Sequence, residues 1–129
     1  MLNLLLYPMM GLSVLIAIQY IRLFSLRVKI IKNKDNDVFV LKEELTNNNI
    51  KNLFEAPVLF YIICLLVIIG DIRPIGFEVL AWIYVCLRYV HSVIHSRSHR
   101  RRYRGPVFVF SMMVLLVMWL YGFYCLWLG

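Results

Sequence analysis

Four long apolar stretches constrain this chain more than any other feature of its sequence. Each is close to the ~20 residues that an α-helix needs to cross the hydrocarbon core of a bilayer. Hydrophobic residues make up 62% of the 129 residues, compared with roughly 45–50% in a soluble domain. The stretches are Leu2–Phe24, Leu53–Gly70, Ile75–Ile94 and Val107–Leu128.

The order of these stretches predicts an all-α fold: one domain over residues 1–129 that forms a four-transmembrane-helix bundle with up-down-up-down topology. We expect helices over residues 2–28, 45–70, 74–97 and 105–128. The short connection Gly70–Pro74 has a glycine typical of helix C-caps and a proline that cannot continue a helix. So short a connection makes the second and third helices antiparallel neighbours. The mixed charge of residues 29–49 predicts a solvated loop, with the second helix able to begin near Val38.

Basic side chains occur at the end of the third apolar stretch, with Arg88 and His91 inside it and His95 directly after it. Arg88, His91 and His95 stand at i, i+3 and i+7, which places them on one face of a helix. A charged group near the middle of a membrane helix costs roughly 2.5–3.5 kcal/mol, so it rarely persists without a partner or a function. We therefore expect this stripe to belong to a functional site.

A second polar stripe precedes the apolar part of the second helix. Asn48, Asn52 and Glu55 stand at i, i+4 and i+7, with Lys51 beside them. Because the two helices are antiparallel, we expect the stripes to meet and Glu55 to form an ion pair with Arg88, each stabilising the other's charge. The alternative is a buried polar network that fixes only helix register and subunit assembly.

The histidines raise the question of a metal. His91 and His95 have the i, i+4 spacing of a di-histidine site, to which Glu55 or His99 could add a ligand. The arginines around them would repel a divalent cation, so we expect no metal there. The three cysteines lie in apolar stretches without metal-ligand spacing, and we expect them to be inert.

Arg104 stands just before the fourth apolar stretch. The amino end of a helix already carries positive potential, which disfavours a cation and favours an anion. An arginine at this position therefore suggests an anionic ligand or a thiolate nearby.

Two motifs together resemble a known family. They are Asn52-x-x-Glu55-x-Pro57 and Arg88-x-x-His91-Ser92-x-x-His95, followed by Arg104. On four apolar stretches they resemble the MAPEG family, the membrane-associated proteins in eicosanoid and glutathione metabolism, and residues 49–61 are similar to its bacterial branch. The resemblance covers essentially the whole chain.

The resemblance implies a homotrimer that binds glutathione as co-substrate between neighbouring subunits, close to the cytoplasmic side. It implies a glutathione transferase or peroxidase that acts on a lipophilic electrophile. Arg104 would be the catalytic residue that activates the thiol. The residues implied to bind glutathione or to support its site are Asn48, Lys51, Asn52, Glu55, Arg88, His91 and His95. Three positions depart from the family's pattern, namely Asn48, His99 and Phe108, and they bear on glutathione affinity.

The basic residues predict orientation and location. Most of them lie in residues 29–49 and 97–104, so we expect both segments to be cytoplasmic and the protein to be a multi-pass protein of a bacterial inner membrane. We expect membrane lipids and a lipophilic small molecule as partners, and no nucleic acid. Two other functions remain open: a non-catalytic membrane protein whose polar cluster serves assembly or lipid binding, and a metal-dependent lipid enzyme.

Overall fold

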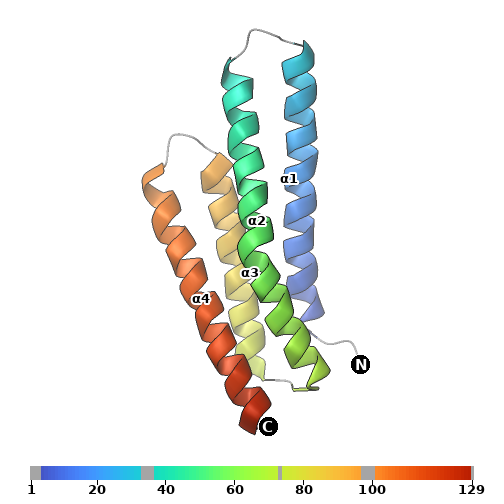
Figure 1. Ribbon diagram of the computed structural model, residues 1–129, viewed down its shortest axis with the longest axis vertical. Coiled ribbons are helices and arrows are strands. Elements are labelled where there is room, and N and C mark those ends of the chain that lie inside the picture. Colours follow the sequence, from blue (N-terminus) through green and yellow to red (C-terminus); the bar gives the residue numbers. More distant parts are fainter. Residues whose placement is uncertain (1–3, 33–36, 73, 97–100, 129) are drawn as a thin grey trace.

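Four α-helices form the molecule in the computed structural model, which describes residues 4–32, 37–72, 74–96 and 101–128 (Figure 1). The side chains of Leu53, His95, Ser96 and residues 101–104 lie outside this description. Each helix is long and apolar enough to cross a membrane. The predicted all-α four-helix fold is confirmed. The helices are α1 (Leu6–Lys32), α2 (Asp37–Ile69), α3 (Ile75–Ser96) and α4 (Arg101–Leu128).

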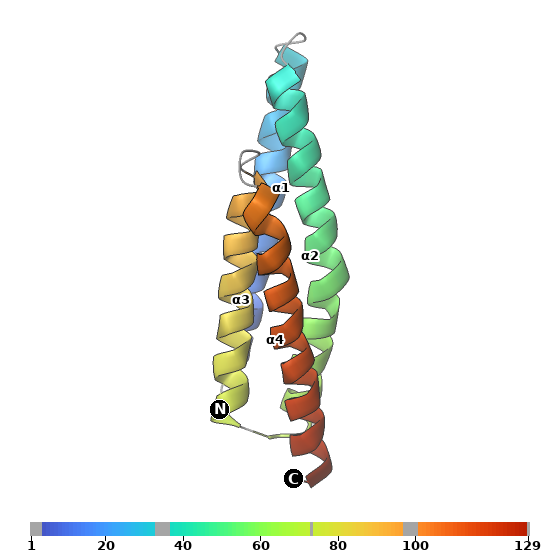
Figure 2. The same cartoon turned by 90° about the vertical axis from the view of Figure 1, so that its left-hand side faces the viewer.

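The helices pack as two hairpins. α1 packs most extensively on α2, and α3 on α4, while α2 joins the two pairs through smaller contacts with α3 and α4. The carboxyl ends of α1 and α3 and the amino ends of α2 and α4 lie towards one end of the bundle (Figures 1 and 2). The α2–α3 turn, the start of α1 and the end of α4 lie at the other. The helix ends that flank the two basic segments of the sequence are therefore at the same end of the bundle, as an up-down-up-down topology requires.

The α1–α2 hairpin extends past the end of the α3–α4 hairpin (Figure 1). α2 has 33 residues and α3 has 22, or about 50 Å and 33 Å of helix. Arg27 Nε lies 3.2 Å from Glu43 Oε1 in the overhang, and Lys29 Nζ lies 5.8 Å from the centre of the Phe39 ring. Residues 29–32 and 37–49 are therefore helical rather than a solvated loop, and α2 starts at Asp37, next to the Val38 start that the sequence allowed. No glycine or proline occurs between residues 12 and 56 to end either helix earlier.

The α2–α3 turn ends α2 with an aspartate in the left-handed conformation. Asp71 has φ 49°, and no described glycine has a positive φ. Ile72 N donates to Val67 O at 3.3 Å and Asp71 N donates to Ile68 O at 3.0 Å, the two hydrogen bonds of a Schellman motif. The helix does end at the predicted Gly70–Pro74 connection, but the left-handed residue is Asp71 and not the glycine before it. Aspartate tolerates this conformation better than most side chains.

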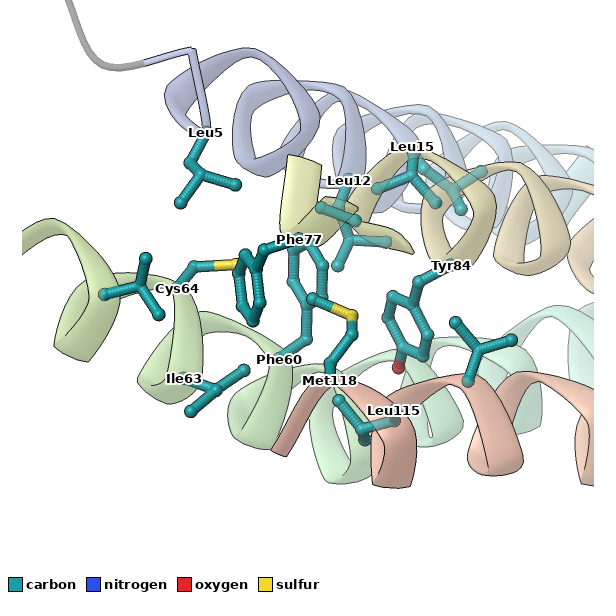
Figure 3. Close-up of a cluster of buried hydrophobic side chains, with 14 residues drawn as sticks. Leu5, Leu12, Leu15, Phe60, Ile63, Cys64, Phe77, Tyr84, Leu115 and Met118 are labelled. Atoms are coloured by element: carbon teal, nitrogen blue, oxygen red, sulfur yellow. The ribbon is translucent and has the colours of Figure 1, made fainter. Parts of the chain in front are cut away.

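The interior divides into an apolar half and a polar half. Near the α2–α3 turn, apolar side chains from all four helices form a continuous core, with the Phe60 and Tyr84 rings stacked 4.8 Å apart (Figure 3). The buried polar side chains gather from mid-bundle towards the basic connections, and we call this set the polar core. Its members are Gln19, Thr46, Asn49, Arg88, His91, Ser92 and Ser111.

A partly buried hydrogen bond joins α3 to α1 across the bundle. The Tyr89 hydroxyl donates to the Gly11 carbonyl at 2.6 Å. We expect Tyr89→Phe to lower the free energy of unfolding by about 0.6 kcal/mol, the average for interhelical hydrogen bonds in membranes. Tyr20→Phe is the matched control, because Tyr20 contacts Phe54 through its ring. Denaturant titration in mixed micelles measures both, and equal losses would contradict the assignment.

Candidate functional site

The α3 stripe faces the bundle interior. Arg88 is 0% exposed, and His91 and Ser92 are each 1% exposed. Arg88 is the fourteenth of the 22 residues of α3, so it lies about 12 Å from the carboxyl end of the helix and within hydrocarbon depth. The backbone of His95 continues the same helix, and its side chain lies outside the described residues. The stripe thus places a guanidinium and an imidazole inside the subunit.

The α2 stripe faces outward instead. Asn48, Lys51 and Glu55 are exposed on the single subunit, and Asn52 is half-buried. In the described part of the chain no ion pair joins Glu55 to Arg88. The predicted pairing of the two stripes is therefore wrong within one subunit.

The physical reason is the rotation of α2 about its axis. Its interior face is marked by Thr46, Asn49, Pro57 and Phe60, which follow a spacing of three to four residues. At 100° per residue, Glu55 lies about 120° around the helix from Asn49. α2 also continues through Pro57 without a break. Asn48, Asn52 and Glu55 do share one face of α2, but this face does not point towards Arg88.

Asn49 occupies the position opposite the α3 stripe. Ser92 Oγ donates to Asn49 Oδ1 at 3.4 Å, and both residues are buried. Thr46, one turn before Asn49, donates from its hydroxyl to the Lys42 carbonyl at 2.8 Å. Sequence reasoning missed Asn49 and Ser92 as interior partners. The spacing of Asn49 from the buried residues Pro57 and Phe60 was the signal that could have found them.

α4 closes the polar core from the other side. The rings of His91 and Phe108 lie 5.8 Å apart and are inclined by 49°. Ser111 is fully buried and donates from its hydroxyl to the Phe108 carbonyl at 2.7 Å. Phe108, one of the departures from the family pattern, therefore lines the space beside His91.

Arg104 lies in the first turn of α4, because this helix starts at Arg101 rather than at residue 105 as predicted. The backbone N–H groups of the first four helical residues have no partners within a helix, so the Arg104 amide is one of them. Phe108 follows one turn later on the same face. The side chain of Arg104 lies outside the described residues, and its predicted role stays a prediction.

The described residues contain no group of three His, Cys, Asp or Glu that could hold a metal ion. The di-histidine alternative uses His91 and His95, with Glu55 or His99 as a third ligand, and it stays untested because the His95 side chain and His99 lie outside the described residues. Cys64 is buried, Cys86 is exposed, Cys125 is half-buried, and all three are free thiols.

Comparison with known families decides what kind of protein has this architecture. The model of the MAPEG family matches residues 5–124. The chain belongs to the MAPEG family. With four helices able to span a bilayer, this MAPEG protein is an integral membrane protein. Among curated proteins and among solved structures, none matches the chain.

Proposed function

We propose that this MAPEG protein is a glutathione-dependent transferase or peroxidase that acts on lipophilic electrophiles from within a bacterial inner membrane. The observation that carries the proposal is the family match over residues 5–124. In the transferase reaction a glutathione thiolate attacks the electrophilic carbon and a leaving group departs as an anion. In the peroxidase reaction two glutathione thiols reduce a hydroperoxide to an alcohol and water, and glutathione disulfide forms.

The outward stripe of α2 supports a binding site between subunits. An ionised Glu55 that faced lipid would cost roughly 2.5–3.5 kcal/mol at this depth. A neighbouring subunit and a polar ligand would replace that lipid, which is the arrangement of a homotrimer with glutathione at its interfaces. In this assignment Asn48, Lys51, Asn52 and Glu55 hold the peptide part of glutathione.

The remaining site residues flank that stripe. In this proposal Arg104 favours the thiolate through its positive charge, and the basic residues at the helix ends support a site on the cytoplasmic side. Arg88, His91 and His95 support the site from α3.

Apolar grooves on the outer surface support a lipophilic co-substrate. One of about 430 Å³ is lined by α2 and α4, at Leu59, Met112, Leu115, Leu116 and Trp119. Another of about 420 Å³ runs along α3. Ligand sites usually have volumes of about 300–1,000 Å³. A groove open to lipid admits a substrate that partitions into the membrane.

Glutathione binding to the purified protein tests the proposal. We expect saturable binding at millimolar glutathione or below by isothermal titration calorimetry in detergent micelles. S-Methylglutathione is the matched ligand control, because it keeps the peptide and cannot form a thiolate. An absence of saturable glutathione binding up to millimolar concentration would contradict the proposal.

The second candidate is a non-catalytic protein whose polar residues serve assembly. The Asn49–Ser92 hydrogen bond favours it, because a hydrogen bond between helices can serve helix packing without any ligand. This candidate predicts that Glu55→Gln weakens the oligomer in detergent and that the wild type conjugates no thiol. Light scattering of the variant, together with a conjugation assay of the wild type, separates the two functions.

A further inference from the structure

Opposite charges are separated between the two helices of the first hairpin. α1 contains four basic residues and no acidic residue, whereas the first eight residues of α2, Asp37–Glu44, contain three acidic residues and one basic residue. Where the two helices touch, Arg27 and Glu43 form an ion pair at 3.2 Å. The described residues contain no ion pair for the other charges at this end of the hairpin.

Three of the α1 cations form what we call the basic face. Arg22, Lys29 and Lys32 follow one another at intervals of seven and three residues, which places them on one side of the helix. Lys29 and Lys32 are exposed and Arg22 is half-buried. Arg27 faces α2 and lies about 160° around α1 from Lys29. Lys29 also contacts the Phe39 ring, which leaves its charge without a counter-ion.

Two of the α2 carboxylates form what we call the acidic face. Asp37 and Glu44 are seven residues apart on the same side of the helix, and both are exposed. Glu44 lies about 100° around α2 from Glu43, which faces α1. Lys42 lies about 160° around α2 from Glu44 and does not share this face. One turn after Glu44 comes Asn48, so the acidic face continues the outward stripe of α2.

The basic and acidic faces lie at matching heights along the bundle. Because α1 and α2 are antiparallel and Arg27 contacts Glu43, the level of Glu44 falls between Arg22 and Lys29. Asp37, the first residue of α2, is level with Lys32, the last residue of α1. A cyclic oligomer in a bilayer has its axis along the membrane normal, so neighbouring subunits meet at equal heights.

We propose that the basic face of α1 in one subunit docks against the acidic face of α2 in the next subunit of the same chain. An anionic lipid surface would attract the basic face and repel the acidic one, whereas a second copy neutralises both. The contact joins two different faces, so it runs head to tail and closes into a ring. This inference rests on the homotrimer of the proposed function, and it makes no use of glutathione or of thiol chemistry.

Carbodiimide cross-linking of the wild-type protein in detergent micelles tests the contact. The reagent joins a carboxylate to a lysine amine that touches it, so a contact between subunits gives covalent dimers and trimers on a denaturing gel. Peptide mass spectrometry should find Glu44 linked to Lys29, or Asp37 linked to Lys32, in the dimer band. Links between these residues that occur only in the monomer band would overturn the proposal.

Neighbouring carboxylates give a matched pair of variants. Glu44→Gln should lower the yield of covalent dimer several-fold, because it removes one of the two reactive carboxylates of the acidic face. Glu43→Gln changes the adjacent residue, which pairs with Arg27 inside the subunit, and should leave the yield unchanged. Equal yields from the two variants would contradict the assignment of the acidic face.

A charge exchange gives an independent readout from the strength of association. Glu44→Lys should weaken the oligomer at least about two-fold in dissociation constant, since one exposed ion pair contributes about two- to five-fold. Lys29→Glu should weaken it similarly, and the double variant should recover the wild-type value. Sedimentation equilibrium in density-matched detergent measures all four proteins. Additive losses in the double variant would mean that the two side chains do not meet.

The outcomes separate this contact from the proposed function. An oligomer by light scattering that gives no carbodiimide dimer retains the proposed assembly and overturns the contact between the charged faces. Carbodiimide dimers from a protein without saturable glutathione binding support the contact and contradict the proposed transferase or peroxidase.

Discussion

Replacing Arg104 with alanine should lower the rate of glutathione conjugation at pH 7 by about 30-fold through loss of thiolate alone. A free cysteine thiol ionises near pH 8.5, so only about 3% is thiolate at pH 7. A cation that converts all of the thiol to thiolate therefore raises the reactive fraction about 30-fold. Stabilisation of charge in the transition state adds to the loss, since a single oxyanion-hole donor contributes about 10²–10³-fold. Initial rates with a lipophilic chlorodinitrobenzene measure the change.

The pH dependence separates activation of the thiol from binding. Above pH 9 free glutathione is mostly thiolate, so the part of the deficit of Arg104→Ala that comes from ionisation should disappear. Arg27→Ala is the matched control, since Arg27 lies in the overhang paired with Glu43, and its rate should equal that of the wild type. A deficit of Arg104→Ala that is the same at pH 7 and pH 9.5 would contradict a role in ionising the thiol.

A valine at Gly122 should destabilise the bundle by about 1–3 kcal/mol, the usual cost of overpacking a core. A Cβ at this position would lie 2.8 Å from Ile63 Cδ1, 3.1 Å from Ile63 Cγ1 and 3.4 Å from Phe77 Cε2. α4 therefore approaches α2 and α3 more closely here than a side chain permits. Small residues allow such close packing between membrane helices. The free energy of unfolding in mixed micelles measures the loss.

Gly105 gives a control without a packing clash. A Cβ added there meets nothing within 4 Å apart from its chain neighbours, so Gly105→Ala should cost much less than Gly122→Val, and any cost comes from Pro106, which disfavours a helical residue with a Cβ before it. Ile63→Ala should be less costly in the Gly122→Val background than in the wild type, because it removes the two clashing atoms. Additive effects of Gly122→Val and Ile63→Ala would show that this contact is not the cause.

Sequence reasoning predicted the helices well because lipid imposes a simple rule on them. A segment that crosses the hydrocarbon must satisfy its backbone internally, so about 20 apolar residues indicate a helix. The ends of the helices were harder to predict from the sequence. The charged residues around Lys29 and Glu43 predict a loop, but helices continue into water when no glycine or proline ends them. At the α2–α3 turn, Asp71 and Gly70 are both compatible with a left-handed cap, and local geometry selects between them.

The polar site was predicted only in part. The periodicity of α3 placed Arg88 and His91 on one face, and both are buried. For α2 the charged residues defined the stripe, although the interior face follows Asn49 and the apolar residues after it. In a membrane protein the interior is not much more apolar than the lipid-facing surface. Hydrophobic periodicity therefore does not tell which side of α2 faces inward, and this is why Glu55 was paired with Arg88.

The division of the bundle into two hairpins has a consequence for its biogenesis. Most packing partners of α1 lie on α2, and most partners of α3 lie on α4, so each half makes its main contacts between helices adjacent in sequence. Synthesis proceeds from the N-terminus, and local contacts form quickly. The first hairpin can thus leave the translocon and pair before α3 is made. The second hairpin then enters the membrane after the first, joined to it by the α2–α3 turn.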